Sequence, residues 1–151
     1  MTPHIPKDAH FEEKVRTSFS RQLAMGTLGV DIHSVEPGRV ELKFDHDPKL
    51  TQQHGFIHGG ILTTVMDSAC GYAAFSLMPE NSAVLTIEFK TNLLSPARGK
   101  TYLAVGKVKK PGRTITVCDG ELFAFDDGKK KLAATMTCTL MCIEDRDDVR
   151  G

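Results

Sequence analysis

The sequence lacks several features that would place it in a large class of proteins. Lysine plus arginine and aspartate plus glutamate number 19 each, so no net charge of one sign attracts nucleic acid or an anionic membrane. The beginning, MTPHIPKDAHFEEK, has no basic region followed by an apolar run, and we expect no secretory signal. Threonine, serine, aspartate and glycine interrupt the most apolar segment, 61–78, which indicates a buried helix rather than a membrane span. A cytoplasmic protein is therefore expected.

Cysteine is also scarce, and the four residues show no Cys-x-x-Cys spacing. If Cys138 and Cys142 lie on one strand, four residues of about 3.3 Å each separate them by roughly 13 Å. That separation is too long for a disulfide or for a shared zinc ion. The pattern favours small buried hydrophobic residues in a reducing compartment, which applies equally to Cys70 and Cys118.

A metal site is not expected either. His54 and His58 have the spacing at which two histidines on one helix can chelate a metal. Gly55, Gly59 and Gly60 argue against a helix across that span, and no third ligand stands near in the sequence. We predict no metal and no cofactor.

With 151 residues and no internal repeat, the chain is expected to form one domain with a substantial core. Apolar residues four apart predict an amphipathic helix from about 10 to 24, with Phe11, Val15, Phe19 and Leu23 on one face. One buried helix followed by long antiparallel strands is an α+β arrangement. Residues 1–8 and 144–151 are expected to be flexible tails. Strands are expected at 28–35, 40–45, 83–94, 100–110, 113–126 and 131–143, with the central helix at 61–78.

The strand patterns indicate what surrounds the central helix. In the strand at 83–94, alternation places Leu85, Ile87, Phe89 and Leu93 on one face and Thr86 on the other. The central helix is apolar nearly all round, so we expect that one sheet face cannot bury it and that a partner subunit covers the rest.

The most informative segment runs from Gln52 to Gly60 and is followed, six residues later, by Asp67. A glycine-rich turn leads directly into the apolar helix, and the first N–H groups of a helix have no partner inside it. Such an end can hold an anion or a developing oxyanion. A carboxylate within an apolar helix is costly unless it is used or paired. Backbone donors together with this carboxylate indicate acyl transfer.

These residues carry a family resemblance. The pattern Q-x-x-G-x-x-H-G-G-x6-D resembles the N-x-x-G-x-x-H-G-G-x6-D pattern of the PaaI-like acyl-CoA thioesterases, which have the hotdog fold. The segment 84–97, VLTIEFKTNLLSPA, looks like that family's next strand, and 109–114 looks like its following hairpin. The resemblance covers roughly residues 25–143 and is strongest to the YigI-like subgroup, which is associated with medium- and long-chain acyl-CoA. One departure is Gln52, where most members have asparagine.

The resemblance implies a role for each residue of the motif. Asp67 would be the general base for water or the nucleophile, and the Gly59 N–H would polarise the thioester carbonyl. Gln52 would position the nucleophile or the thioester. His58 would organise the turn, and Thr86 matches a strand position that holds water in some members. Gly60, like Gly59, would let the substrate approach the backbone closely.

The coenzyme A half of the substrate needs cations for its phosphates. Lys110 and Arg113 flank a Pro-Gly turn, and Lys90 and Arg98 bracket the preceding strand. These four are candidates for binding coenzyme A, although basic residues at hairpins are commonly just solvated. Phe56, with Ile57, Tyr72, Phe75 and Met78, is a candidate lining of an apolar tunnel for a fatty or aryl acyl group.

Helix geometry predicts that one chain does not complete the site. Eight residues separate Gly59 from Asp67, a rise of about 12 Å, whereas an attacking group must lie within roughly 3–3.5 Å of the carbonyl carbon. We therefore expect a homodimer with shared sites, assembled further into a homotetramer. An acyl-CoA thioesterase is the expected function. The alternatives are a non-catalytic acyl-CoA binder and a hotdog dehydratase or hydratase.

Overall fold

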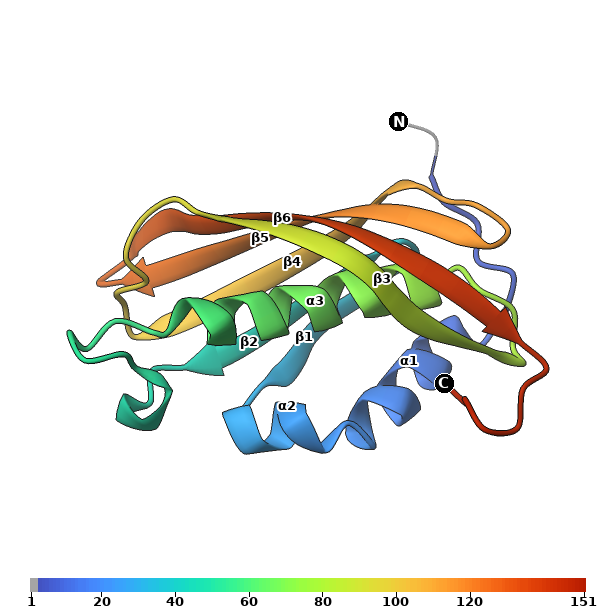
Figure 1. The fold of residues 1–151 in the computed structure, drawn as a ribbon, viewed down its shortest axis with the longest axis horizontal. Helices are drawn as coiled ribbons and strands as arrows, with labels where there is room; N and C mark the ends of the chain where they lie inside the picture. Colours follow the sequence, from blue (N-terminus) through green and yellow to red (C-terminus); the bar gives the residue numbers. More distant parts are fainter. Residues whose placement is uncertain (1–2) are drawn as a thin grey trace.

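The computed structural model describes residues 3–151 and shows one antiparallel sheet curved around a central helix, α3 (Gly59–Phe75) (Figure 1). A short 3-10 turn, Pro48–Leu50, precedes that helix. The expected α+β arrangement is confirmed. The other elements, in chain order, are α1 (Phe11–Ser20), α2 (Leu23–Leu28), β1 (Asp31–Glu36), β2 (Arg39–Asp45), β3 (Ser82–Leu93), β4 (Thr101–Lys110), β5 (Ile115–Asp126) and β6 (Lys129–Glu144).

The six strands lie in the order β1-β2-β4-β5-β6-β3, and every neighbouring pair is antiparallel. The strand that follows α3 in the chain therefore lies at an edge of the sheet, paired only with β6. Pro111-Gly112 and Asp126-Asp127-Gly128 form the expected turns at the two ends of β5. The sheet places β3 beside α3 and leaves its other edge unpaired within residues 3–151.

Two glycines allow α3 to lie unusually close to the sheet. Gly106 of β4 and Gly120 of β5 face each other across the ladder. A Cβ atom on Gly106 would lie 2.2 Å from the Ala69 carbonyl oxygen, and one on Gly120 would lie 3.0 Å from Cys70 Sγ. Because side chains are absent at these two positions, the helix backbone rests almost directly on the strands and the core is densely packed.

The N-terminal helix is shorter than expected. Val15 is fully buried and Phe19 packs against the core, but α1 ends at Ser20 and Gln22 adopts an extended conformation. The prediction that Leu23 belongs to the buried face is wrong, since it is 83% exposed. A separate short helix, α2, follows and ends at Gly29, whose positive φ of 69° terminates it. Only the last residue of this helix, Leu28, falls within the strand that the sequence pattern predicted at 28–35.

The expectation that α3 would need a partner subunit to cover it is wrong for most of its length. From Val65 onward nearly every residue of α3 is buried within the single chain. The helix α1 supplies the missing cover at its C-terminal end. Lys14 Nζ donates to the carbonyl oxygens of Met78 at 2.7 Å and Pro79 at 3.1 Å, and it lies 4.5 Å from the Phe75 ring centroid.

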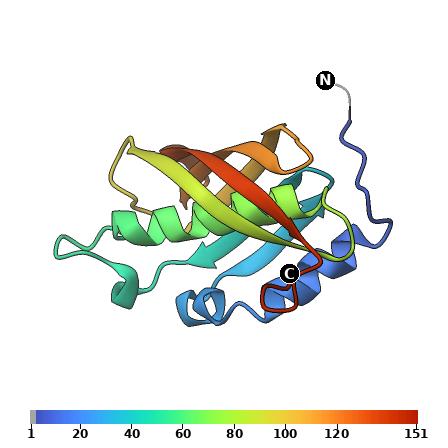
Figure 2. The ribbon, with the colours of Figure 1, turned by 45° about the vertical axis from the view of Figure 1, so that its right-hand side comes forward.

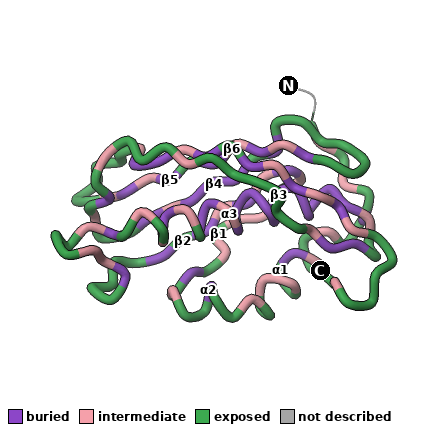
Figure 3. The backbone as a smooth tube through the Cα atoms, in the orientation of Figure 1, coloured by how far each residue is buried: buried purple, intermediate pink, exposed green. Residues whose placement is uncertain are grey.

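Exposed apolar side chains gather instead on β3. The pairing of β3 with β6 shifts between Thr86 and Glu88, which is the signature of a β-bulge at Ile87. The bulge breaks the expected alternation. Thr86 pairs with Leu140 and Phe89 with Cys138, both buried, so Thr86 and Phe89 share the face towards α3 while Leu85 lies on the other face. Figure 3 shows β3 largely exposed beside the buried α3. The exposed large hydrophobic residues at this edge are Leu85 (46%), Ile87 (53%), Phe89 (46%), Leu93 (60%) and Leu94 (55%).

The two ends of the described chain both lie against the body of the domain. Lys7 N–H donates to the Leu77 carbonyl oxygen, and the segment after β6 turns back towards α1 (Figure 2). The flexibility expected of residues 1–8 and 144–151 stays a prediction, and residues 1 and 2 lie outside the described part. Across residues 3–151, no helix combines the length and the apolar character that crossing a bilayer requires.

Candidate active site

The turn before α3 is closed by its own polar groups. The Gln52 side-chain oxygen accepts a hydrogen bond from the His54 N–H at 2.5 Å, and the Gln52 N–H donates to the Phe56 carbonyl oxygen at 2.9 Å. Gly55 has a φ of 85°, a conformation that glycine adopts at no steric cost. The Gln52 amide thus braces the turn within this chain, while its expected role at a thioester stays a prediction.

His58 caps α3. Its Nδ1 accepts a hydrogen bond from the Gly60 N–H at 2.9 Å, as expected of a residue that organises the turn. The neighbouring Gly59 N–H finds no acceptor within residues 3–151. A Cβ atom at Gly59 would lie 2.6 Å from Leu93 Cδ1, so Gly59 packs closely against the Leu93 side chain. The helix start therefore presents one free, positively polarised donor.

Asp67 lies eight residues further along α3 and faces β3. Thr86 Oγ1 donates to Asp67 Oδ1 at 2.8 Å, and Cys138 Sγ lies 3.7 Å from the same oxygen. The pairing of Thr86 with the buried Leu140 of β6 directs its side chain to this position. Asp67 has intermediate exposure and is therefore less buried than the apolar character of its helix suggested. A carboxylate that is oriented by a hydroxyl yet reachable from outside is suited to meet a substrate.

Gly59 and Asp67 do not come together within the chain. Both lie on the uninterrupted α3, which spans Gly59–Phe75. A helix of this kind rises about 12 Å between two such positions. One thioester therefore cannot contact both the Gly59 N–H and the Asp67 carboxylate within a single subunit.

The candidate cations are also divided. Arg98 lies 6.0 Å from the Phe56 ring centroid at the Gly59 end of α3. Lys110 and Arg113 lie in the β4–β5 turn at the opposite end of the domain (Figure 1), where Arg113 borders a cavity beside Met78. The fourth candidate cation, Lys90, is exposed on β3 and donates to Asn92 Oδ1 at 3.0 Å.

A cavity of about 300 Å³ opens beside Asp67 and Thr86. The hydroxyl groups of Ser18 and Tyr72 lie 3.3 Å apart on its lining. Of the expected tunnel residues only Tyr72 lines this cavity, since Ile57 is in the core and Met78 borders another cavity. The contributions of α1 to this cavity were not predicted from the sequence, because a pairing between distant helices leaves no periodic signal. The cavity beside Asp67 is lined by Ser18, Arg21, Gln22, Asp67, Ser68, Gly71, Tyr72, Ala83, Val84, Leu85, Thr86, Val149, Arg150 and Gly151.

The thiols near Asp67 are not poised for reaction. The hydrogen bond with Cys138, together with burial, raises the pKa of Cys70 well above its usual range. Burial raises the pKa of Cys118 strongly as well. All four cysteines are free and buried, as expected. Because the thiolate is the nucleophilic form, the Cys70 and Cys118 thiols are inert at neutral pH and Asp67 is the stronger candidate for the reacting group.

A metal centre has no support in the described structure. Within residues 3–151, no three His, Cys, Asp or Glu side chains are grouped closely enough to hold a metal ion. His54 and His58 lie in the non-helical turn, and His58 is engaged with Gly60.

Comparisons with known proteins identify the family. The family model described as Thioesterase superfamily matches residues 54–131, just over half of the chain. A candidate esterase from Saccharolobus solfataricus is 31% identical over 107 residues, which cover 71% of this chain and 69% of that protein. The chain belongs to the Thioesterase superfamily. This confirms the expectation of an enzyme of the thioester hydrolase class.

Solved structures of this superfamily agree with the fold. A thioesterase family protein from Silicibacter pomeroyi is 56% identical, with a TM-score of 0.89 covering 89% of this chain and 99% of that one. The PaaI protein of E. coli shares the fold at 21% identity, with a TM-score of 0.79 over 91% and 96% of the two chains. The hotdog fold and the PaaI-like resemblance are confirmed.

The YigI-like subgroup stays a prediction. The medium/long-chain acyl-CoA thioesterase YigI of Salmonella typhimurium is 23% identical to the chain over 129 residues. That match covers 76% of this chain and 81% of the Salmonella protein.

Proposed function

We propose that this thioesterase-superfamily protein hydrolyses acyl-CoA thioesters with medium or long fatty or aryl acyl groups, releasing the free acid and coenzyme A. The observation that carries the proposal is the pairing of Asp67 with Thr86 beside an open cavity. A carboxylate held in this way can take a proton from water or attack the carbonyl carbon itself. The Gly59 N–H would polarise the thioester carbonyl, and the chemistry needs no cofactor.

The active unit in this proposal is a homodimer. The free Gly59 N–H and the Asp67 carboxylate lie on one helix and are about 12 Å apart along it. A two-fold axis beside the exposed β3 edge would place α3 helices antiparallel, so that Gly59 of one subunit meets Asp67 of the other. The apolar side chains of β3 provide the surface for this pairing. A further assembly into a tetramer remains part of the proposal.

The same arrangement accounts for the division of the cations. Arg98 and Phe56 lie at the Gly59 end of the domain, whereas Lys110 and Arg113 lie beyond the far end of α3. In an antiparallel dimer the far end of one subunit approaches the Gly59 end of the other. We therefore place the coenzyme A phosphates between Arg98 of one subunit and the Lys110 and Arg113 hairpin of its partner, with Lys90 beside them.

A thiol-release assay tests the proposal. Acyl-CoA thioesters from acetyl to palmitoyl, together with phenylacetyl and benzoyl thioesters, would be offered to the wild-type protein and to Asp67→Asn. We expect turnover of the apolar thioesters by the wild type and a loss of at least about 1,000-fold in the variant, with acyl-CoA binding retained. Turnover by Asp67→Asn close to the wild-type rate would exclude the assigned role. Binding of acyl-CoA without turnover by the wild type would favour a non-catalytic acyl-CoA-binding protein.

A further inference from the structure

The segment Asp145–Gly151, which follows β6, reaches the candidate site. Asp145 has a φ of 54°, a left-handed conformation that aspartate tolerates better than most residues, and its N–H donates to the Asn81 carbonyl oxygen. The chain reverses there and runs back between β3 and α1 (Figures 1 and 2). The guanidinium of Arg21, on the residue that caps α1, then donates to the Gly151 carbonyl oxygen.

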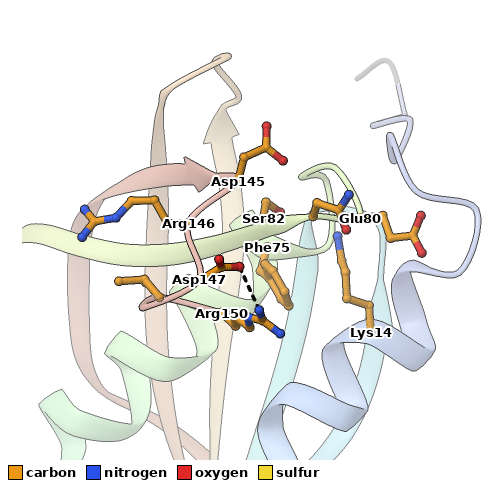
Figure 4. Close-up of a pocket in the computed structure, with 11 residues that line it drawn as sticks. Lys14, Phe75, Glu80, Ser82, Asp145, Arg146, Asp147 and Arg150 are labelled. Atoms are coloured by element: carbon orange, nitrogen blue, oxygen red, sulfur yellow. Dashed lines mark hydrogen bonds and ion pairs between the residues drawn. The ribbon is translucent and has the colours of Figure 1, made fainter.

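This segment separates two cavities. The first contains Asp67 and Thr86. The second, of about 450 Å³, is bordered by Lys14, Phe75 and the same segment (Figure 4). Val149, Arg150 and Gly151 border both cavities, so they form the wall between them.

The segment Asp145–Gly151 contacts the body of the domain through the hydrogen bonds of Asp145 and Gly151 and through the close packing of Gly151 against Phe75. Its ion pairs lie within the segment, between Arg146 and Asp148 and between Arg150 and Asp147, the latter at 2.8 Å. Val149 is the only apolar side chain among residues 145–151 and is less exposed than its immediate neighbours. The side chains of the segment contribute little to the core, because only one of them is apolar and exposed ion pairs stabilise weakly. Its position matters mainly for the volume beside Asp67.

We propose that Asp145–Gly151 forms the end wall of the acyl pocket and sets the length of acyl chain that the enzyme accepts. This inference rests on the proposed function, because it takes the cavity beside Asp67 as the acyl pocket. The carbonyl carbon lies at Asp67, and the acyl chain runs past Gly71 and Tyr72 on α3 towards Val149. Removal of the wall joins the two cavities and gives room to additional methylene groups, while a larger side chain at Val149 removes room.

Two changes test the inference, one that enlarges the acyl pocket and one that reduces it. One ends the chain after Glu144, and the other is Val149→Trp. The matched control is Asp148→Ala, because Asp148 lies in the same segment but borders neither cavity. The measurement is kcat/KM for unbranched acyl-CoA thioesters from butyryl to palmitoyl, after circular dichroism has established that each variant is folded.

We expect the shortened chain to prefer longer acyl groups and Val149→Trp to prefer shorter ones, with the control unchanged. Each methylene that gains or loses an apolar site should change kcat/KM about threefold to fourfold. An unchanged length profile in Val149→Trp, or a uniform loss at every length, would overturn the inference. If the shortened chain does not fold, Val149→Trp alone decides. A wild-type protein that hydrolyses no acyl-CoA would instead contradict the proposed function.

Discussion

At the scale of single residues, the contact between Thr86 and Asp67 is the most informative, because it orients a carboxylate that remains open to a substrate. A hydrogen bond to a charged group is roughly twice as strong as one between neutral groups. The bond fixes one carboxylate oxygen and leaves the other for water or for the thioester. Thr86 is therefore a positioning residue in the proposed mechanism.

Replacement of Thr86 by valine tests this role. Valine keeps the shape and removes the hydroxyl, so we expect kcat to fall about tenfold while KM changes little. Thr86→Ser, which restores a hydroxyl, should recover most of the loss. If Thr86→Ser is as slow as Thr86→Val, the effect lies in packing rather than in the hydrogen bond.

The buried thiols give a second prediction at this scale. The hydrogen bond with Cys138 and burial keep Cys70 protonated, and burial keeps Cys118 protonated, so neither should react with a disulfide reagent at pH 8 until the protein unfolds. Both folded-state pKa values lie above the ordinary value of 9.0. Stability should therefore be unaffected below about pH 9 and decline above it, since only the unfolded thiols ionise there.

Thiol counting in native buffer and in urea measures the first effect, and urea unfolding from pH 7 to pH 10.5 measures the second. The double variant Cys70→Ala and Cys118→Ala serves as the control, because it should show a smaller alkaline decline. Rapid labelling of Cys70 or Cys118 in the native protein would contradict the prediction.

At the scale of elements, the packing of α3 on the sheet depends on Gly106. A Cβ atom there would lie 2.2 Å from the Ala69 carbonyl oxygen, a backbone atom that cannot move aside alone. We expect Gly106→Ala to lower the free energy of unfolding by about 1–3 kcal/mol, the usual cost of overpacking a core.

Gly26→Ala is the matched control for Gly106→Ala. Gly26 lies in α2, and a Cβ atom there meets nothing within 4 Å. Alanine is preferred over glycine in a helix, so this change should be neutral or stabilising by up to about 1 kcal/mol. Urea unfolding of both variants measures the difference. Equal stability of the two would show that α3 can move away from β4 without cost.

At the scale of the whole molecule, the separation of Gly59 from Asp67 predicts that each active site is shared between two subunits. Gly59→Pro removes the N–H at the first position of α3, where the helix backbone tolerates proline, although its Cβ atom must displace the end of the Leu93 side chain. Asp67→Asn removes the carboxylate. Each variant alone should be inactive, since every shared site lacks one half.

Mixing the two variants should restore activity. Random pairing of equal amounts makes about half of the dimers mixed, each with one intact site, so roughly a quarter of the wild-type activity should return. Circular dichroism must show that both variants fold, and size-exclusion chromatography that they form dimers. No recovery after verified subunit exchange would contradict the shared site. As a control, Asp67→Asn mixed with itself should stay inactive.

The sequence alone was enough to predict the central helix, the six strands, the turn before the helix and the family. These features depend on residues that are close together in the chain. The glycine-rich turn that ends at His58 and the alternating pattern of β6 are examples. The spacing of Gly59 and Asp67 on one helix also follows from the sequence, because helical rise is the same in every protein.

Only the tertiary structure decided which groups meet across the domain. The pairing of Thr86 with Leu140 directs Thr86 to Asp67, the extended Gln22 exposes Leu23, and α1 covers part of the helix α3, for which a partner subunit was expected. The turn at Asp145 brings the last segment to the cavity beside Asp67. Each outcome depends on contacts between residues far apart in the chain. Local periodicity does not encode such contacts, because they are selected by how the whole core packs.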